Sequence, residues 1–493
     1  MTTRTPLLAF SAVAALMVGV SLPDSEARTW TQAETGRKIE ADFVGVEGDQ
    51  VVLSVNGKPA KVPLKQLSEE DQAFVAEASA KVSGETAGSA VNNGKDWPKW
   101  RGADGSDIAP AEGIKDEWPD GGPSQLWVYD GAGMGYSSFS VVDGTLYTMG
   151  TRGEDVYVVS VDTADGEEIW ATKISEDDQQ GYSAGWGHGP RSTPTFDNGK
   201  IYALGPKGEL VCLSAADGSK VWSKNLVDDF GGKWGGWGYA ESPLVDGDKV
   251  VVGPGGQDAG IVALNKETGA TIWKATDVKP GKAEYASIVP TEMHGKRQYI
   301  RLFESEVVSV DAETGEVLWR TEWPGKTAVI PTPIVDGNEV FITSGYGVGC
   351  KLVRVSEGGE TEDVWVNKEM KNHHGGVVKI GDYLYGFSDG AGLICQEWDT
   401  GEMVWNEKGQ GKLIKGAVHA VGDQLVCLNE DDGTVTLVDA SPDGFEMHGQ
   451  FQLSPQSENR NPKGKVWAHP VIVDGKLFLR DQEYVVAFDV KKG

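Results

Sequence analysis

The sequence predicts an all-β protein in which an eight-bladed β-propeller follows a small β module. Two phrases that recur at intervals of roughly 40 to 55 residues carry this prediction. The first joins an apolar run to an Asp-Gly turn, as in Thr332-Pro-Ile-Val-Asp-Gly-Asn-Glu-Val-Phe341. The second ends in tryptophan, as in Val308-Ser-Val-Asp-Ala-Glu-Thr-Gly-Glu-Val-Leu-Trp319. A third observation is that residues 28–78 are distinct from the repeats, which marks them as a separate module.

The turn that closes the first strand of each repeat gives the number of blades. Short strands with alternating apolar residues flank each turn, as expected for blades that bury their faces against one another. The eight turns are Asp143-Gly144, Asn198-Gly199, Asp246-Gly247, His294-Gly295, Asp336-Gly337, Gly381-Asp382, Gly422-Asp423 and Asp474-Gly475.

Tryptophan ends the outer strand of most repeats and is expected to pack against the neighbouring blade. The last repeat stops before any outer strand, whereas residues 124–130 supply one ahead of the ring. We therefore expect residues 97–493 to form the propeller, closed by the strand 124–130, which removes the open sheet edges. The predicted docking residues are Trp127, Trp170, Trp222, Trp273, Trp319, Trp365 and Trp405.

Residues 1–27 predict a secretory signal peptide. An apolar stretch over residues 6–22 follows a positive charge, and Ser25 and Ala27 occupy the −3 and −1 positions of a cleavage site. A membrane anchor is the alternative, but no stop-transfer flank follows the stretch. No cysteine lies near the cleavage site for a lipid anchor, and no later segment is apolar enough to span a membrane. The expected location is therefore periplasmic or secreted.

The charge and the cysteines limit the partners and the cross-links. The formal net charge of −29 disfavours nucleic acid and anionic lipid surfaces. A protein or small-molecule ligand is the expected partner, with the chain as a monomer or as part of a larger assembly. The four cysteines lie in strand patterns of different repeats and predict buried free thiols rather than disulfides: Cys212, Cys350, Cys395 and Cys427.

Residues 28–78 contain three extended runs, a hairpin turn at Asn56-Gly57 and a capped short helix after Ser68. They resemble the small SH3-like homology module first named from a yeast endocytic adaptor, which implies a small β-barrel. Trp30 fits a barrel core or, as the alternative, a peptide groove. Residues 79–96 are rich in Gly, Ser, Ala and Asn and predict a flexible linker. The matching pieces are Trp30-Thr31, Glu40-Ala41, Val51-Val52-Leu53, Val62-Pro63-Leu64 and Leu67-Ser68-Glu69-Glu70-Asp71.

The repeats resemble the tryptophan-docking propeller of pyrroloquinoline quinone (PQQ) proteins. The resemblance rests on Asp311-Ala-Glu-Thr-Gly-Glu-Val-Leu-Trp319 and on Asp96-Trp-Pro-Lys-Trp-Arg-Gly102 ahead of the ring. It implies the fold more firmly than a cofactor, because the superfamily includes the non-enzymatic BamB-type scaffold of outer-membrane protein assembly. Its enzymes place the quinone between a tryptophan and two adjacent, disulfide-linked cysteines, beside a calcium ion. This chain has no adjacent cysteine pair and no assignable calcium triad, so PQQ is not supported.

The segments just before the first strand of each repeat are expected to converge at one mouth of the propeller channel. They are rich in histidine and aromatic residues, which suit ligand or peptide binding, a transition metal, acid–base chemistry, or a structural lining of exposed strand ends. The candidate ligand-binding residues are Tyr136, His188, Arg191, Tyr239, Glu241, Tyr285, His373, His374 and His469.

Together these features favour an exported, non-catalytic propeller that acts as a binding or assembly scaffold. The alternative is a PQQ- or metal-dependent oxidoreductase working at the histidine-rich mouth. Neither a nucleophile motif nor a phosphate-binding loop is present to indicate another enzyme class.

Overall fold

The computed structural model describes residues 28–31, 38–47, 50–55, 58–68, 71–72, 74–75, 95–407, 409, 411 and 413–493. The predicted signal peptide and residues 79–94 of the predicted linker lie outside these residues. The chain divides into two compact units, Met1–Ala90 and Val91–Gly493, and each is described by itself.

The first unit is a small antiparallel sheet built around a buried tryptophan. Its strand order is β1-β2-β3-β4. Trp30 is 1% exposed and its Nε1 donates to the carbonyl oxygen of Ala41 at 2.9 Å, so this side chain serves the core. The Asp71 amide donates to the Ser68 hydroxyl at 3.2 Å, the expected helix cap. The elements are β1 (Arg28–Thr31), β2 (Lys38–Glu47), β3 (Gln50–Val55), β4 (Lys58–Pro63) and the 3₁₀ turn η1 (Leu64–Gln66).

The second unit is an eight-bladed β-propeller, as predicted. Within the described part of the chain it contains eight sheets, seven of four strands and one of five. The first four blades consist of β7 (Ser140–Val142), β8 (Thr145–Arg152), β9 (Asp155–Asp162) and β10 (Glu168–Glu176); β11 (Thr195–Asp197), β12 (Lys200–Leu204), β13 (Glu209–Ser214) and β14 (Lys220–Asn225); β15 (Leu244–Asp246), β16 (Lys249–Val252), β17 (Val262–Asn265) and β18 (Thr271–Lys274); and β19 (Val289–Met293), β20 (Lys296–Leu302), β21 (Glu306–Asp311) and β22 (Val317–Glu322).

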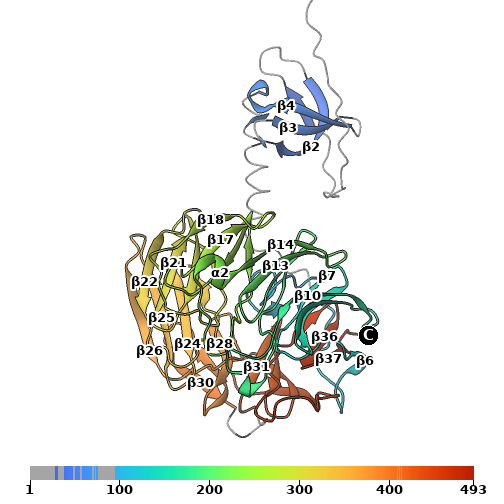
Figure 1. Cartoon of the computed structure of the whole chain (residues 1–493), viewed down its shortest axis with the longest axis vertical. Helices are drawn as coiled ribbons and strands as arrows, with labels where there is room; N and C mark the ends of the chain where they lie inside the picture. The colour runs from blue at the N-terminus through green and yellow to red at the C-terminus, as the bar shows by residue number, and fades with distance from the viewer. Residues whose placement is uncertain are drawn as a thin grey trace, which may run out of the picture. The chain divides into compact units, whose positions relative to one another are not determined.

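The remaining blades complete the ring (Figure 1). A short helix, α2 (Leu226–Phe230), and a 3₁₀ turn, η2 (Ala184–Trp186), lie between blades. Blades five to eight consist of β23 (Ile334–Asp336), β24 (Glu339–Ser344), β25 (Gly349–Val355) and β26 (Thr361–Asn367); β27 (Val377–Ile380), β28 (Tyr383–Ser388), β29 (Gly392–Glu397) and β30 (Met403–Asn406); β31 (Gly416–Val421), β32 (Gln424–Asn429), β33 (Thr434–Asp439) and β34 (Met447–Gln452), with β5 (Ile108–Ala109) beside β31; and β35 (Val471–Val473), β36 (Lys476–Asp481), β37 (Tyr484–Asp489) and β6 (Ser124–Tyr129).

The two ends of the ring meet in the eighth blade. Strand β6 pairs antiparallel with β37, with Tyr129 opposite Val485 and Trp127 opposite Ala487. Figure 1 shows β6, β36 and β37 side by side where the chain end approaches the first blade. This pairing turns an open array of blades into a closed one.

Six of the seven docking tryptophans join one blade to the next through a hydrogen bond, and the bond of Trp319 stays within its own blade. Six of the seven indole Nε1 groups donate to a backbone carbonyl oxygen in the following repeat, and Trp319 donates to the Gln298 side chain at 2.8 Å instead. Five of the rings also cover a glycine of the following repeat; a Cβ at Gly315, for example, would lie 2.5 Å from Trp273 Cε3. The repeat phrase therefore encodes the joints between blades as well as the strands.

The four cysteines are buried free thiols, as expected. Burial raises the pKa of Cys212, Cys350 and Cys395 to about 11 each, so these thiols are protonated near neutral pH. In the part of the chain that is described, we find no helix with the length and apolar character needed to cross a bilayer.

Candidate ligand-binding cavity

A segment ahead of the ring crosses the axial channel and forms a floor. The backbone of Trp97 pairs with that of Val141. Arg101 then donates from Nη2 to the Val377 carbonyl oxygen at 2.9 Å and lies 3.8 Å from Asp107. Trp100 and Arg101 line two cavities, one of about 490 Å³ and one of about 330 Å³. The channel is thereby divided, and the larger cavity becomes a pocket closed at one end.

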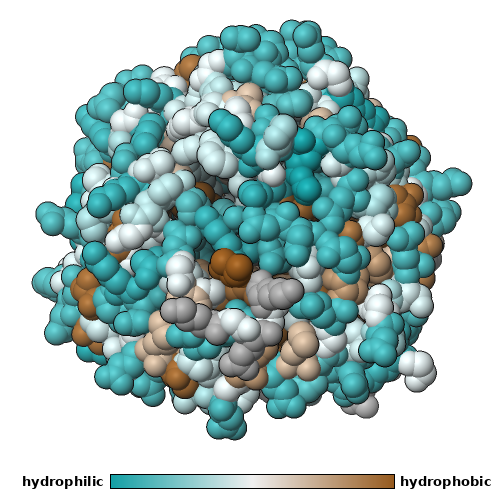
Figure 2. Space-filling model, turned by 90° about the horizontal axis from the view of Figure 1, so that it is seen from below, coloured by the Kyte–Doolittle hydropathy of each residue, from teal (hydrophilic) through white to brown (hydrophobic). Residues whose placement is uncertain are grey.

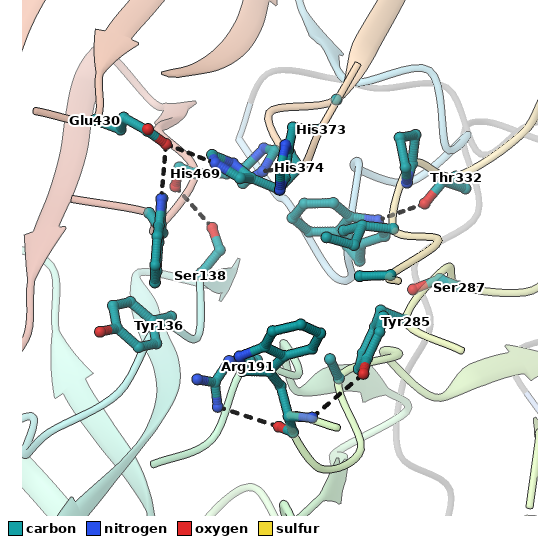
Figure 3. A pocket seen from close by; sticks show the side chains of 18 of the residues that line it. Tyr136, Ser138, Arg191, Tyr285, Ser287, Thr332, His373, His374, Glu430 and His469 are labelled. Atoms are coloured by element: carbon teal, nitrogen blue, oxygen red, sulfur yellow. Dashed lines mark hydrogen bonds and ion pairs between the residues drawn. The ribbon is translucent and has the colours of Figure 1, made fainter. Parts of the chain in front are cut away.

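The larger cavity has the size and composition of a ligand site. Pockets for small ligands span roughly 300 to 1,000 Å³ and combine apolar walls with a few polar groups. Among the described residues, the walls carry seven Trp or Tyr rings and a single carboxylate, that of Glu430. Figure 3 labels two of these rings, Tyr136 and Tyr285. The aromatic lining consists of Trp100, Tyr136, Trp186, Trp237, Tyr285, Tyr346 and Trp467.

Six of the nine candidate residues line this cavity: Tyr136, Arg191, Tyr285, His373, His374 and His469. The structure places the other three, His188, Tyr239 and Glu241, outside the lining. Ala240 and Ser242 line the cavity on either side of Glu241, because successive side chains of an extended segment point in opposite directions. Glu241 accordingly points away and forms a buried ion pair with Arg301, and its Oε1 accepts from the Gly253 amide at 2.7 Å. Tyr239 is 1% exposed and donates to the Pro254 carbonyl oxygen at 2.8 Å.

The first histidine of the cavity lies between a cation and a carboxylate. His373 Nδ1 is 3.0 Å from Lys415 Nζ and 3.2 Å from Asp389 Oδ2, and its ring is 4.3 Å from that of Tyr346. Burial raises the pKa of Asp389, but the His373 hydrogen bond and the Lys415 charge outweigh it and bring the pKa to about 2. The Asp389 carboxylate is therefore negatively charged near neutral pH, and it lies beside the lining residue His373.

The second histidine is held by the carboxylate of Glu430. His374 Nε2 lies 2.6 Å from Glu430 Oε2, which also accepts from the Trp467 indole at 2.8 Å (Figure 3). Burial raises the pKa of Glu430, but these two partners and Lys415 lower it to about 2. Burial lowers the pKa of His374, so a neutral ring donates from Nε2 to the ionised carboxylate. The carboxylate thus orients two rings of the wall.

The third histidine is packed into the floor. His469 stacks edge-on against Trp100, with ring centroids 4.6 Å apart, and its Nε2 donates to the His374 carbonyl oxygen at 3.0 Å. Burial lowers the pKa of His469 to about 4, so the ring is neutral near pH 7. His469 therefore packs against Trp100 as a neutral ring.

The opposite wall is built by Arg191 and the loop that contains Trp237. The Arg191 guanidinium lies 5.2 Å from the centroid of the Tyr136 ring and donates to the Trp237 carbonyl oxygen at 3.3 Å. The Trp237 amide donates to the Tyr285 hydroxyl at 3.3 Å (Figure 3). The glycine-rich segment around Trp237 is therefore tied into the cavity wall by hydrogen bonds.

Several residues of the cavity were not among the candidates from the sequence. Trp467 and Ser138 lie two residues from His469 and Tyr136 in the same extended segments, so alternation could have found them. Trp100 and Glu430 come from the pre-ring segment and from a loop after an inner strand, where the repeat pattern gives no signal.

The lining does not fit a calcium-bound quinone. A calcium ion takes six to eight oxygen ligands, often from several carboxylates. Among the described lining residues Glu430 alone supplies a carboxylate, and it already binds His374 and Trp467. None of the four cysteines lines the cavity. The residue set that would hold this cofactor is not assembled here.

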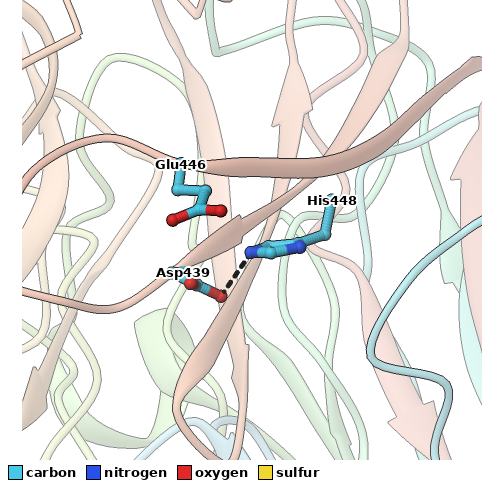
Figure 4. A group of neighbouring side chains, drawn as sticks. All are labelled: Asp439, Glu446 and His448. Atoms are coloured by element: carbon cyan, nitrogen blue, oxygen red, sulfur yellow. Dashed lines mark ion pairs between the residues drawn. The ribbon is translucent and has the colours of Figure 1, made fainter.

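The cavity histidines do not form a metal cluster either. Among the described residues, one group of three His, Asp or Glu ligand atoms lies within 4.8 Å of one another, and it consists of Asp439, Glu446 and His448 (Figure 4). This group lies around β33 and β34 in the seventh blade, and none of its members lines the cavity. Exposed acidic groups of this kind commonly exist without an ion.

The exposed hydrophobic side chains of the described residues are spread over the outer strands of several blades. Figure 2 shows a face on which hydrophilic side chains dominate and hydrophobic ones are scattered. The exposed aliphatic residues of the blades lie mostly one or two to an outer strand, as Ile169, Val221, Ile272 and Val404 do. Scattered residues of this kind are ordinary on a soluble surface.

Comparison with known proteins agrees with the two-unit organisation. Residues 21–82 match the SLA1 homology domain 1, and residues 152–407 match the family described as outer membrane protein assembly factor BamB. The BamB of Burkholderia pseudomallei is 27% identical over 356 residues, which cover 63% of this chain and 86% of the relative. Quinoprotein alcohol dehydrogenase PedH of Pseudomonas putida is 25% identical over 305 residues, or 58% of this chain and 43% of that enzyme.

Solved structures show the same fold at low sequence identity. BamB from Moraxella catarrhalis superposes with a TM-score of 0.52 at 15% identity, covering 75% of this chain and 98% of that one. Quinohemoprotein alcohol dehydrogenase ADHIIG from Pseudomonas putida gives 0.57 at 15% identity, with 80% of each chain covered. The family match extends over residues 152–407, just over half of the 493 residues, and this chain therefore belongs to the family of outer membrane protein assembly factor BamB.

Proposed function

We propose that this chain is an exported, non-catalytic propeller scaffold that binds its ligand or partner segment in the aromatic cavity at the channel mouth. The observation that carries the proposal is the cavity itself, about 490 Å³ in volume, closed by Trp100 and walled by aromatic rings. Its titratable groups are engaged in holding these rings, as Glu430 holds His374 and Trp467. Relatives named as assembly factors support a scaffold role for the fold.

Export is part of this proposal and rests on residues 1–27. Cleavage after Ala27 would leave Arg28, the first residue of β1, as the new N-terminus. N-terminal sequencing of the protein from a periplasmic or secreted fraction should give Arg28-Thr-Trp. An intact N-terminus in a membrane fraction would contradict this part of the proposal.

Cavity binding is tested with a neutral aromatic probe, naphthalene-2-carboxamide, titrated into the purified protein by calorimetry. We expect saturable binding near one per chain. Ala240→Trp should abolish it, because Ala240 lines the cavity with a small side chain that a large ring would replace. Ile169→Trp, on an outer strand and 50% exposed, is the matched control and should bind normally. Binding that survives Ala240→Trp would contradict the proposal.

The quinoprotein alternative is tested on the same preparation. PQQ and calcium are added together, and dye reduction is followed with a panel of alcohols and sugars. We expect no turnover, because the cavity offers one engaged carboxylate and no cysteine. Turnover that depends on both additions would overturn the non-catalytic assignment.

A further inference from the structure

Arg191 differs from the other cations that line the cavity. Each of the other three lies near a carboxylate. Lys465 is 2.6 Å from Asp431, Lys415 is 3.5 Å from Asp389, and Arg101 is 3.8 Å from Asp107. Among the described residues no carboxylate oxygen lies within 4.0 Å of the Arg191 guanidinium. Arg191 is thus the lining cation whose charge is not neutralised by a direct partner.

The contacts of Arg191 hold the guanidinium in place and leave donors over. Nη1 donates to the carbonyl oxygens of Gly189 at 3.2 Å and Trp237 at 3.3 Å, and Nη2 donates to that of Gly187 at 3.0 Å. A guanidinium has five N–H groups, so these three bonds leave two of them for another acceptor. A planar cation held in this way is prepared to bind a planar anion such as a carboxylate.

The surroundings of Arg191 add an aromatic contact. The guanidinium lies over the Tyr136 ring at 5.2 Å, and the Trp467 ring is 5.1 Å from that same tyrosine ring. Trp237 and Tyr285 form a second pair of rings in the cavity lining, with their centroids 6.0 Å apart. A ligand that reaches Arg191 therefore passes aromatic faces and edges, against which another ring can pack.

The rest of the protein works against nonspecific binding of anions. The net charge of −29 repels them at a distance, and salt screens that repulsion only in part. An anion that enters the cavity must gain its affinity from local contacts. The partly desolvated Arg191 supplies such contacts, because charge-assisted hydrogen bonds strengthen where water is excluded.

We propose that the cavity binds an aromatic carboxylate, with the carboxylate on Arg191 and the ring against Tyr136, Trp237 and Trp467. This inference rests on the proposed function, since it names the ligand class of the same cavity. Two sources carry the chemistry: a free aromatic acid, and the C-terminal residue of a peptide that ends in Trp, Phe or Tyr. Trp186 and Tyr346, 44% and 36% exposed, lie at the rim, where a longer chain would leave the cavity.

The test compares acids with their amides by calorimetry. Naphthalene-2-carboxylate is compared with naphthalene-2-carboxamide, and the peptide Gly-Gly-Trp with its C-terminal amide. We expect at least one acid of the two pairs to bind about ten-fold or more tightly than its amide, as a lost charged hydrogen-bond partner implies. A preference within the small pair alone identifies a free acid as the source, and a preference within the peptide pair identifies a chain terminus.

Variants of Arg191 distinguish binding of the carboxylate by this residue from binding of the ring by the rest of the cavity. Arg191→Gln should remove the preference for acid over amide and leave amide binding in place, whereas Arg191→Lys should keep part of the preference. Arg320→Gln, on an outer strand with a 46% exposed side chain, is the matched control and should change neither. Thermal unfolding confirms that each variant is folded, and the lysine variant carries the test if the glutamine variant is not.

Two results would overturn the inference in different ways. Equal binding of acid and amide by the unmodified protein removes the carboxylate anchor and leaves the proposed function standing. Absence of binding by every acid and amide removes the proposed function as well. A preference that persists in folded Arg191→Gln assigns the anion to another cation and also overturns the role given to Arg191.

Discussion

The docking of tryptophan on glycine can be tested with two glycines that share a backbone conformation. Gly315 lies between β21 and β22 with φ +75°, and Gly337 lies between β23 and β24 with φ +57°. Alanine in this left-handed region costs about 1–2 kcal/mol at either site. A Cβ at Gly337 would meet nothing within 4 Å, whereas one at Gly315 would lie 2.5 Å from Trp273 Cε3 and 2.8 Å from Cδ2.

The second cost arises because Trp273 has little freedom to move. Its indole donates to the Ala312 carbonyl oxygen at 3.0 Å, and its ring stacks on Tyr299 with 6.2 Å between centroids. Overpacking a site of this kind costs about 1–3 kcal/mol. We therefore expect Gly315→Ala to lower the free energy of unfolding by about 2–5 kcal/mol and Gly337→Ala by about 1–2 kcal/mol.

Urea unfolding followed by circular dichroism measures both variants, and a Trp273→Ala background completes a double-mutant cycle. In that background Gly315→Ala should cost no more than Gly337→Ala, because the clash is gone. Equal midpoints for the two alanine variants in the unmodified protein would refute the reasoning. So would a Gly315→Ala penalty that is unchanged when Trp273 is removed.

Three further predictions follow from the buried titratable groups. Burial lowers the pKa of His469 from 6.5 to about 4, so the unfolded chain takes up the proton first as the pH falls. Up to about 3 kcal/mol of stability should therefore be lost between pH 6.5 and 4. In His469→Gln the urea midpoint should depend less on pH in that range. Glu430 has its pKa lowered from 4.5 to about 2, so its contribution should be lost as the pH falls through that lower range, and Glu430→Gln should reduce this second loss. A thiol reagent at pH 8 should leave the native protein unmodified over minutes but titrate four thiols in urea without reductant, and fewer than four would indicate a disulfide.

The ring could be predicted because its information is local and repeated. Each turn places a glycine or Asn/Asp residue where φ is positive, as at Asp143 (φ 50°) and Asn198 (φ 45°), and each phrase carries its own docking tryptophan. The hydrogen bond of Trp319 differs, because its acceptor, Gln298, lies on β20 of the same blade, and no feature of the repeat phrase signals this. The repeat phrase thus predicts where each tryptophan lies around the ring, but not which group accepts its hydrogen bond.

The floor of the cavity could not be predicted from the repeats, since it comes from a segment that is used once. Trp100 reaches Thr332 on the fifth blade, with its indole donating to the hydroxyl at 3.2 Å, although 232 residues separate them. The segment continues into β5, which pairs parallel with β31 in the seventh blade. Contacts of this range have no sequence period, so only the fold could bring them together.

Glu241 shows how a one-residue difference separates a structural group from a site group. Its neighbours Ala240 and Ser242 line the cavity, while its own carboxylate lies 1% exposed between blades and pairs with Arg301. Removing one partner of such a pair strands a buried charge at a cost of about 3–5 kcal/mol. Arg191, at the corresponding entrance of the preceding blade, has the opposite relation: it faces the cavity without a carboxylate. Glu241, whose charge is paired with a residue of the next blade, is structural, and Arg191, which faces the cavity, is the candidate for binding.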